Sequence, residues 1–269
     1  MKASHQLNGN GNGTPAAAHS LAPEGLANRL GEAVEGRLAR NSIIVLQARM
    51  NSARLPGKVL TEIAGVSILG HCIKRLKAAN VGEVIVATTT RAEDAAVVAE
   101  AERHGARAVR GPVDDVLGRF IVALADWHGP YVFRATADNP VVDIDAPGRV
   151  LKVLEGGADY CVEEGLPVGA AVEGVRTSAL RDAASVAHSA YDREHVTPYL
   201  RHQPGRFKVC PAPAPPECYR PHLRLTVDTR EDFSYVRSLL EQAGAEERLV
   251  PLREVIALAD RYAAWPGVA

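Results

Sequence analysis

Short apolar runs alternate with helix-spaced segments through the middle of this chain. The runs lie at residues 43–46, 83–88, 106–109 and 131–135. The first has the length and composition of a strand that is buried on both faces, and the other three have the length of strands. Segments with apolar residues at helical spacing follow three of them, at residues 67–79, 92–104 and 114–127. This alternation predicts an α/β fold, in which helices cover both faces of a mostly parallel sheet.

The alternation of predicted strands and helices continues after residue 145, but it is less regular there. Helices are predicted at residues 146–154, 178–187, 231–243 and 251–262, with a further helix at residues 191–202 that bends at Pro198. Strands are predicted at residues 159–162, 171–175 and 223–227, with an edge strand at residues 207–209. We therefore expect residues 41–269 to form a single domain around one mixed sheet.

The first 40 residues differ in composition from the rest of the chain. Residues 1–22 are rich in Gly, Asn, Ala and Ser, and bury too little apolar surface to offset the entropy of ordering. Residues 23–40 have leucines and a valine at helical spacing, but three glycines weaken that helix. We expect residues 1–40 to be a disordered or loosely docked tail.

The composition limits the kinds of partner. The net charge of −1 over 269 residues gives no basic excess for nucleic acid or an anionic membrane. No apolar stretch approaches the roughly 20 residues that span a bilayer, and the N-terminus lacks a secretory-signal layout. The four cysteines have no C-x-x-C spacing, which is typical of reduced packing residues. We expect a cytoplasmic protein without nucleic-acid or membrane partners.

The loop after the first apolar run carries three cations, Arg49, Arg54 and Lys58, together with Ser52. Open α/β sheets bind ligands at the carboxyl ends of their strands, and charge-assisted hydrogen bonds to phosphate are strong. The loop therefore predicts a polyphosphate site. It lacks the G-x-x-x-x-G-K-[ST] pattern of a P-loop. The alternative is an ordinary surface loop with solvated side chains.

Two aspartates, Asp138 and Asp228, each follow the end of a predicted strand. Carboxylates placed in this way converge on one Mg²⁺ ion that also binds the phosphates of a nucleotide. The alternative for Asp228 is the N-cap of the helix that begins about two residues later.

Several ordered motifs resemble those of the cytidylyltransferases that make CMP-linked acidic sugars, especially the spore-coat polysaccharide biosynthesis branch. The motifs are A-R-M-N-S-A-R-L-P-G-K, R-G-P-V-D-D-V-L-G-R-F, T-A-D-N-P, E-H-V-T-P-Y-L and T-V-D-T-R-E-D-F. The resemblance implies the Rossmann-like, three-layer nucleotide-diphosphosugar transferase fold. It also implies Mg²⁺-dependent transfer of CMP from CTP to a small acidic acceptor. Related enzymes form homodimers, so we expect residues 155–220 to serve acceptor binding and dimerisation.

The resemblance also implies roles for particular residues. Those expected to contact the nucleotide, beyond Arg49, Arg54 and Lys58, are Ser52, Thr88, Thr89, Asp115 and Arg119. Those expected on the acceptor side are Glu173 and His195. Asp115 has an alternative role in the first turn of its helix, and His195 has one as a hydrogen-bonded helix or interface histidine.

Two departures from the family's usual motifs fall on the acceptor side. Ala171 replaces an acidic residue, and Asn139 stands where family members often have cysteine. These departures leave two alternative acceptors, a sugar acid and a phosphonate. A nucleotide-binding protein without catalytic activity is the alternative of a different class.

Overall fold

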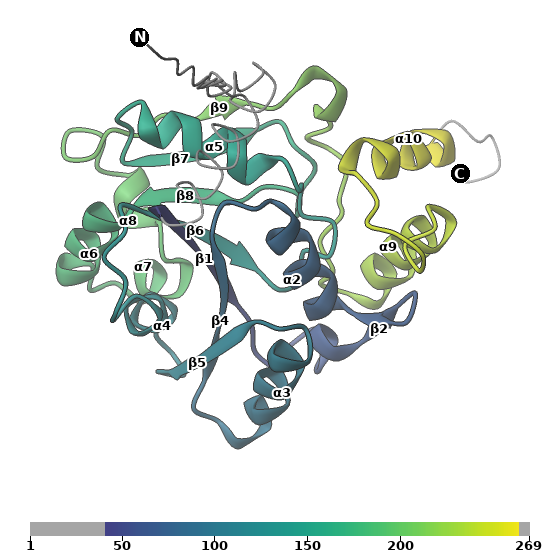
Figure 1. Cartoon of the computed structure of the whole chain (residues 1–269), viewed down its shortest axis with the longest axis horizontal. Coiled ribbons are helices and arrows are strands. Elements are labelled where there is room, and N and C mark those ends of the chain that lie inside the picture. Colours follow the sequence, from purple (N-terminus) through teal and green to yellow (C-terminus); the bar gives the residue numbers. More distant parts are fainter. Residues whose placement is uncertain (1–40, 264–269) are drawn as a thin grey trace, which may run out of the picture. The chain divides into compact units, whose positions relative to one another are not determined.

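A seven-stranded sheet forms the centre of residues 41–263, which this computed structural model describes. Its strands are β1 (Ser42–Gln47), β4 (Glu83–Thr89), β5 (Arg107–Gly111), β6 (Tyr131–Thr136), β7 (Tyr160–Glu164), β8 (Glu173–Arg176) and β9 (Ala212–Pro213). They lie in the order β5-β4-β1-β6-β8-β7-β9 (Figure 1). β8 is antiparallel to both of its neighbours, and the other pairings are parallel. The predicted α/β class with a mostly parallel mixed sheet is confirmed.

Helices pack on both faces of this sheet. They are α2 (Ile68–Ala78), α3 (Ala95–Arg103), α4 (Val116–Ala123), α5 (Ala146–Glu155), α6 (Thr177–Val186), α7 (Ala190–His195), α8 (Pro198–Arg201), α9 (Arg230–Gln242) and α10 (Leu252–Ala263). Figure 1 shows α4, α6, α7 and α8 together at the left of the sheet, and α2, α9 and α10 at its right. The short elements are η1 (Lys58–Leu60), η2 (Ala92–Asp94), η3 (Pro216–Cys218), β2 (Glu62–Ile63) and β3 (Val66–Ser67). The predicted tail, residues 1–40, lies outside the described residues.

The central strand β1 explains why the sheet has two hydrophobic cores. Successive side chains of a strand point to opposite faces. Ile44 and Leu46 therefore join the core that includes α2, α5, α9 and α10, whereas Ile43 and Val45 join the core that includes α4 and α6. Because β1, β4, β5 and β6 are parallel, their carboxyl ends meet at one edge of the sheet. Loops that leave this edge are therefore brought close together.

The segment at residues 223–227 was expected to be a strand, and that prediction is wrong. The segment makes a single bridge, between Arg224 and Val168, and is otherwise irregular. Leu225 N donates to Val168 O at 2.8 Å, whereas Val227 N donates to Asp138 O at 2.8 Å. Because its hydrogen bonds are divided between two different loops, no ladder with one neighbouring strand develops. The segment nevertheless carries Asp228 to the loop that holds Asp138.

The helix expected at residues 191–202 is divided into α7 and α8. The break falls at Val196, before the predicted bend at Pro198. Val196 has φ 73° and ψ −52°, and Thr197 N donates to His195 O at 2.9 Å. This three-residue turn is a rare, strained conformation, most of all for a β-branched side chain. Similarly, residues 207–209 form only an isolated bridge at Val209, and the edge strand is the two-residue β9.

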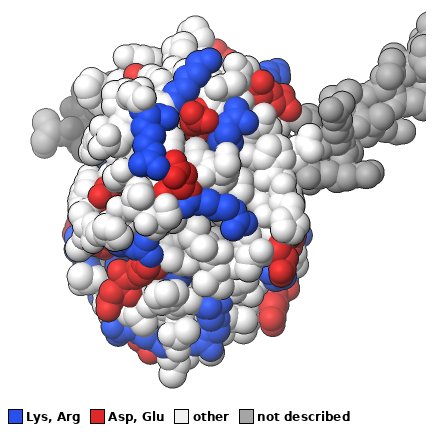
Figure 2. All heavy atoms as spheres, turned by 90° about the vertical axis from the view of Figure 1, so that its left-hand side faces the viewer, with Lys and Arg blue, Asp and Glu red and all other residues white. Residues whose placement is uncertain are grey.

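Charged residues are interspersed by sign on the face that Figure 2 displays, which is the left-hand side of Figure 1. The described residues of this face therefore present no broad patch of a single sign. Among residues 41–263, no helix is both long enough and apolar enough to cross a bilayer.

Candidate nucleotide site

A cavity of about 380 Å³ opens at the edge of the sheet where the parallel strands end. Its polar and charged lining residues come from five parts of the chain. They are Gln47, Arg49, Asn51, Ser52, Arg54 and Lys58 at and after the end of β1, Arg119 on α4, Thr136 and Asp138 at and after the end of β6, Glu194 and His195 on α7, and Asp228 before α9. The structure therefore brings the expected cationic loop and both expected aspartates into one site.

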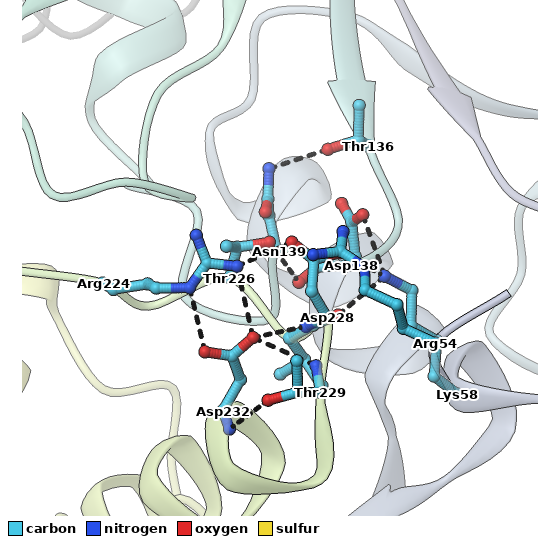
Figure 3. Close-up of polar contacts among 11 residues, drawn as sticks. Arg54, Lys58, Thr136, Asp138, Asn139, Arg224, Thr226, Asp228, Thr229 and Asp232 are labelled. Atoms are coloured by element: carbon cyan, nitrogen blue, oxygen red, sulfur yellow. Dashed lines mark hydrogen bonds and ion pairs between the residues drawn. The ribbon is translucent and has the colours of Figure 1, made fainter. Parts of the chain in front are cut away.

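Lys58 lies at the centre of the site, between the two aspartates (Figure 3). Its Nζ donates to Asp138 Oδ2 at 3.1 Å, to Asp228 Oδ1 at 2.9 Å and to Val227 O at 2.7 Å. The side chain of Lys58 is only 9% exposed, so these are desolvated, charge-assisted contacts. The two carboxylates thus flank a single position that holds a cation.

Asp228 contacts two further cations. Arg54 lies 3.0 Å from its Oδ1, and Arg224 donates to its Oδ2 at 2.7 Å. Burial tends to raise the pKa of Asp228, but the hydrogen bond and charge of Lys58, with Arg224 and Arg54, outweigh this and hold that pKa below its ordinary value. Asp228 is therefore a carboxylate at neutral pH, as a cation ligand must be.

Asp228 does not cap helix α9, so that alternative is wrong. The N-cap is Thr229, whose side chain accepts from Asp232 N, while the Asp232 side chain accepts from Thr229 N at 3.0 Å. This reciprocal capping box leaves Asp228 free to face the cavity. Arg224 and Asp232 were missed from the sequence, although T-x-x-D before a helix is a recognisable capping signal.

The remaining cations lie at different depths. Arg49 and Arg54 are at the mouth, with side chains 45% and 63% exposed, and Arg49 pairs with Glu194 at 3.8 Å. Arg119 is buried, and its Nη1 donates to Pro112 O at 2.8 Å and to Val113 O at 3.0 Å. Burial and the nearby charge of Arg49 lower the pKa of Arg119. Exposed cations at the mouth and a buried cation, Arg119, suit an anionic ligand with an outer and an inner end.

Comparison with known proteins identifies the family. The profile described as Cytidylyltransferase matches residues 43–252 of this chain. The chain belongs to the cytidylyltransferase family. The spore coat polysaccharide biosynthesis protein SpsF of Bacillus subtilis is 31% identical over 226 residues, covering 81% of this chain and 94% of SpsF. The resemblance drawn from the motifs is therefore confirmed, and with it the assignment to CTP-dependent nucleotidyltransferases.

Two further similarities bear on this cytidylyltransferase. A 3-deoxy-manno-octulosonate cytidylyltransferase of Rhodopseudomonas palustris is 37% identical over 120 residues, covering 42% of this chain and 47% of that enzyme. The structure of a cytidylyltransferase from Leptospira borgpetersenii superimposes with a TM-score of 0.75 at 24% identity, covering 83% of this chain and 95% of that one. The structural similarity confirms the predicted fold.

Asp94 supports the cationic loop and was not anticipated from the sequence. It is 1% exposed, its Oδ1 accepts from Met50 N at 2.7 Å, and its Oδ2 accepts from the hydroxyl of Thr89. Thr89 is therefore engaged in holding the loop. Thr88 is fully buried, and its hydroxyl has no hydrogen-bond partner among the described residues. Neither threonine is among the described residues that line the cavity, so their contact with the nucleotide stays a prediction.

Asp115 has the structural role at the start of its helix that was the alternative to nucleotide contact. It is the N-cap of α4, accepting from Gly118 N at 2.7 Å, and its other carboxylate oxygen accepts from Arg193 on α7. It is not among the described residues that line the cavity. Asp115 therefore holds α7, with His195, against the start of α4.

Glu173 and His195 were both expected on the acceptor side, and the structure places them differently. Glu173 accepts from Arg134 at 2.5 Å, from Tyr160 at 2.7 Å and from Thr197 at 2.9 Å, and is not among the described lining residues. Burial and the charge of Glu173 raise the pKa of Tyr160, so its hydroxyl remains a donor. His195 lines the cavity, with its ring 4.6 Å from that of Tyr191.

The residues present fit a Mg²⁺ ion that is shared with a nucleotide. Mg²⁺ prefers oxygen ligands and is usually bound by one or two carboxylates together with substrate phosphates. Asp138 and Asp228 supply two carboxylates about one position. Among residues 41–263, no group of three or more His, Cys, Asp or Glu side chains is arranged to hold a metal. A Mg²⁺ ion bound here would therefore complete its coordination with substrate phosphates and water.

Proposed function

We propose that this chain transfers CMP from CTP to a small acidic acceptor, a sugar acid, and releases pyrophosphate in a Mg²⁺-dependent reaction. The observation that carries the proposal is the meeting of Lys58, Asp138 and Asp228 in a cavity whose mouth carries Arg49 and Arg54. Cations and carboxylates at one strand edge are what a metal–triphosphate complex requires.

In this reaction an acceptor oxygen bonds to the α-phosphorus of CTP as the bond to the β-phosphate breaks. The acceptor's hydroxyl proton passes to solvent at the open mouth, and pyrophosphate leaves. Mg²⁺, when bound, neutralises charge on the phosphates. Arg49, Arg54 and Lys58 orient the phosphates and offset the charge that develops on the leaving group, while Ser52 donates a hydrogen bond to a phosphate or the base. Arg119 lies deepest and is assigned to the nucleotide.

The acceptor is inferred from the relatives. The Rhodopseudomonas palustris relative is named for 3-deoxy-manno-octulosonate, a sugar acid, and the Bacillus subtilis relative for polysaccharide biosynthesis. His195 lines the cavity and is assigned to the acceptor. Glu173 is assigned an indirect role on the acceptor side. It accepts a hydrogen bond from the hydroxyl of Thr197, which lies two residues after His195.

A phosphonate acceptor is the second candidate, because Ala171 and Asn139 depart from the family's usual acceptor-side residues. Ala171 supplies no carboxylate there, and the amide of Asn139 is engaged with Thr136 Oγ1 at 2.7 Å. A catalytically inactive nucleotide-binding protein is the third candidate, and the assembled Lys58–aspartate site weighs against it.

The proposed setting is the cytoplasm, where CTP is available. Supporting this setting is the sequence, in which the four cysteines, Cys72, Cys161, Cys210 and Cys218, have no C-x-x-C spacing. A homodimer formed through residues 155–220 is also proposed, because this half exposes Val168, Tyr191 and Tyr219 at 46%, 58% and 54%.

Pyrophosphate release from CTP and Mg²⁺ across a panel of sugar acids and phosphonates tests the proposal. Release with a sugar acid supports it, and release with phosphonates alone selects the second candidate. If CTP raises the melting temperature while no acceptor works, the inactive candidate is favoured. A shift with ATP, GTP or UTP but not with CTP would contradict the use of CTP.

A further inference from the structure

The ammonium of Lys58 takes the position between Asp138 and Asp228 that a divalent ion would need. We propose that Lys58 is a built-in counter-ion that excludes a metal ion from the site when no nucleotide is bound. A metal ion then enters only together with a nucleoside triphosphate, whose phosphates draw the ammonium of Lys58 away from the aspartates. This inference rests on the metal role proposed above for the two aspartates.

The contacts of Lys58 leave no room for a second cation. An ammonium has three N–H donors, and here each has an acceptor, in Asp138, Asp228 and the carbonyl of Val227. The acceptor distances, 3.1, 2.9 and 2.7 Å, place Nζ directly between the two carboxylates. Two cations at this separation repel strongly in a partly buried site. A metal ligated by both aspartates would therefore have to displace Nζ.

The charges of the cluster formed by Lys58, Arg54 and Arg224 with Asp138, Asp228 and Asp232 are balanced without any ligand. Asp228 contacts Lys58, Arg54 and Arg224, and Arg224 also pairs with Asp232 at 2.9 Å (Figure 3). With Asp138, three carboxylates thus face three cations. A divalent ion alone would leave this cluster with two uncompensated positive charges. A triphosphate brings the compensating negative charge, so the electrostatics favour joint entry of metal and nucleotide.

The cavity offers Lys58 a new partner when nucleotide arrives. Lys58 lines the same cavity as Arg49, Ser52 and Arg54, so phosphate oxygens held by those side chains would lie near its flexible stem. Gly57, at φ 72°, directly precedes Lys58 at the start of η1. Transfer of Nζ from carboxylate to phosphate keeps the ammonium paired and frees both aspartates for the metal.

Binding of Mn²⁺ to the full-length protein tests this directly. Water proton relaxation distinguishes protein-bound Mn²⁺ from free Mn²⁺ and from Mn²⁺ on free CTP. We expect Mn²⁺ to bind the wild-type protein at least about tenfold more weakly without CTP than with it. Lys58→Met should bind Mn²⁺ without CTP about tenfold or more tightly than the wild type. Lys58→Gln, which keeps a donor for Val227 O, serves if the methionine variant does not fold, as judged by circular dichroism.

Arg224→Met is the matched control, because it removes one positive charge from the same cluster without vacating the position between the aspartates. Equal gains in Mn²⁺ affinity for Arg224→Met and Lys58→Met would overturn the proposal, as would wild-type binding without CTP as tight as that of Lys58→Met. Asp138→Asn distinguishes a failure of the proposed metal role of the aspartates from a failure of the proposed exclusion of metal by Lys58. If it leaves Mn²⁺ binding in the CTP complex unchanged, the metal role itself fails. If it abolishes that binding while Lys58→Met gains nothing, only the displacement by Lys58 fails.

Discussion

At the scale of single residues, the site depends on the two carboxylates that contact Lys58, those of Asp138 and Asp228. Asp138→Asn and Asp228→Asn keep the side-chain shape and remove the charge. We expect each to lower kcat by about a hundredfold or more, because metal–phosphate charge stabilisation contributes several kcal/mol. Weak binding of CTP without metal should persist. Pyrophosphate release and CTP titration measure the two effects.

Asp182→Asn is the matched control for these variants, since Asp182 pairs with Arg206 at the surface at 2.6 Å. Asp182→Asn should leave both kcat and the affinity for CTP unchanged. A near-normal kcat in Asp138→Asn or Asp228→Asn would remove that residue from the proposed metal site.

Asp232 makes the stability of this region depend on pH. The hydrogen bond from Arg224 lowers the pKa of Asp232 from 3.8 to about 2. Partial burial opposes this shift, and hydrogen bonds from the backbone N–H groups of Asp228 and Thr229 add to it. A depressed folded-state pKa stabilises the fold above pH 3.8, and that contribution is lost as the pH falls towards 2. Asp232→Asn should lower the free energy of unfolding at pH 7 by on the order of 1 kcal/mol, after allowance for solvent screening.

Urea unfolding between pH 7 and pH 2 measures this contribution. The difference between Asp232→Asn and the wild type should shrink as the pH falls. A constant difference over that range would assign the loss to the capping hydrogen bonds alone.

At the scale of elements, the turn between α7 and α8 carries backbone strain next to His195. Val196 is fully buried at φ 73°, where glycine is favoured. Val196→Gly relieves the strain, whereas Val196→Ala loses the side chain and keeps the strain. We therefore expect Val196→Gly to be more stable than Val196→Ala by about 1 kcal/mol, the reverse of the usual order at a buried site.

Thermal and urea unfolding of the two variants measure the order of stability. Buried Val175 on β8 is the comparison site, since its φ is not positive and alanine should there be more stable than glycine. The same order at both sites would show that the turn is not strained.

At the scale of the whole molecule, the proposed homodimer makes a prediction of its own. Tyr191 is 58% exposed and lies on α7, within the half proposed for dimerisation. If this surface is the interface, Tyr191→Glu should raise the dimer dissociation constant about tenfold or more, because it places a charge in an apolar contact. Sedimentation velocity over a concentration series measures this, with Tyr235→Glu on α9 as the control. A monomeric wild-type protein would contradict the dimer.

Local patterns were sufficient for much of the fold. The runs that became β1, β4, β5 and β6 were predicted within a few residues. The apolar signal is strong in β1, β4 and β6, whose residues are mostly buried, and weaker in the edge strand β5, where Arg107 and Arg110 are exposed. Residues 223–227 misled, since their alternation of apolar and polar residues is the same whether the backbone hydrogen bonds go to one strand or to two loops. The break at Val196 falls two residues before the bend predicted at Pro198, because a proline signals that a helix is interrupted nearby but not at which residue the turn forms.

The sequence by itself determined the α/β class, the cationic loop and the aspartates at strand ends, because each is written in contiguous residues. Only the tertiary structure decided that Lys58 contacts Asp138 and Asp228, which lie 80 and 170 positions further along the chain. It also decided that Asp115 caps a helix and that Glu173 is bound by Arg134, Tyr160 and Thr197. The physical reason is that side-chain partners depend on how loops from different strands converge, and local spacing carries no information about that convergence.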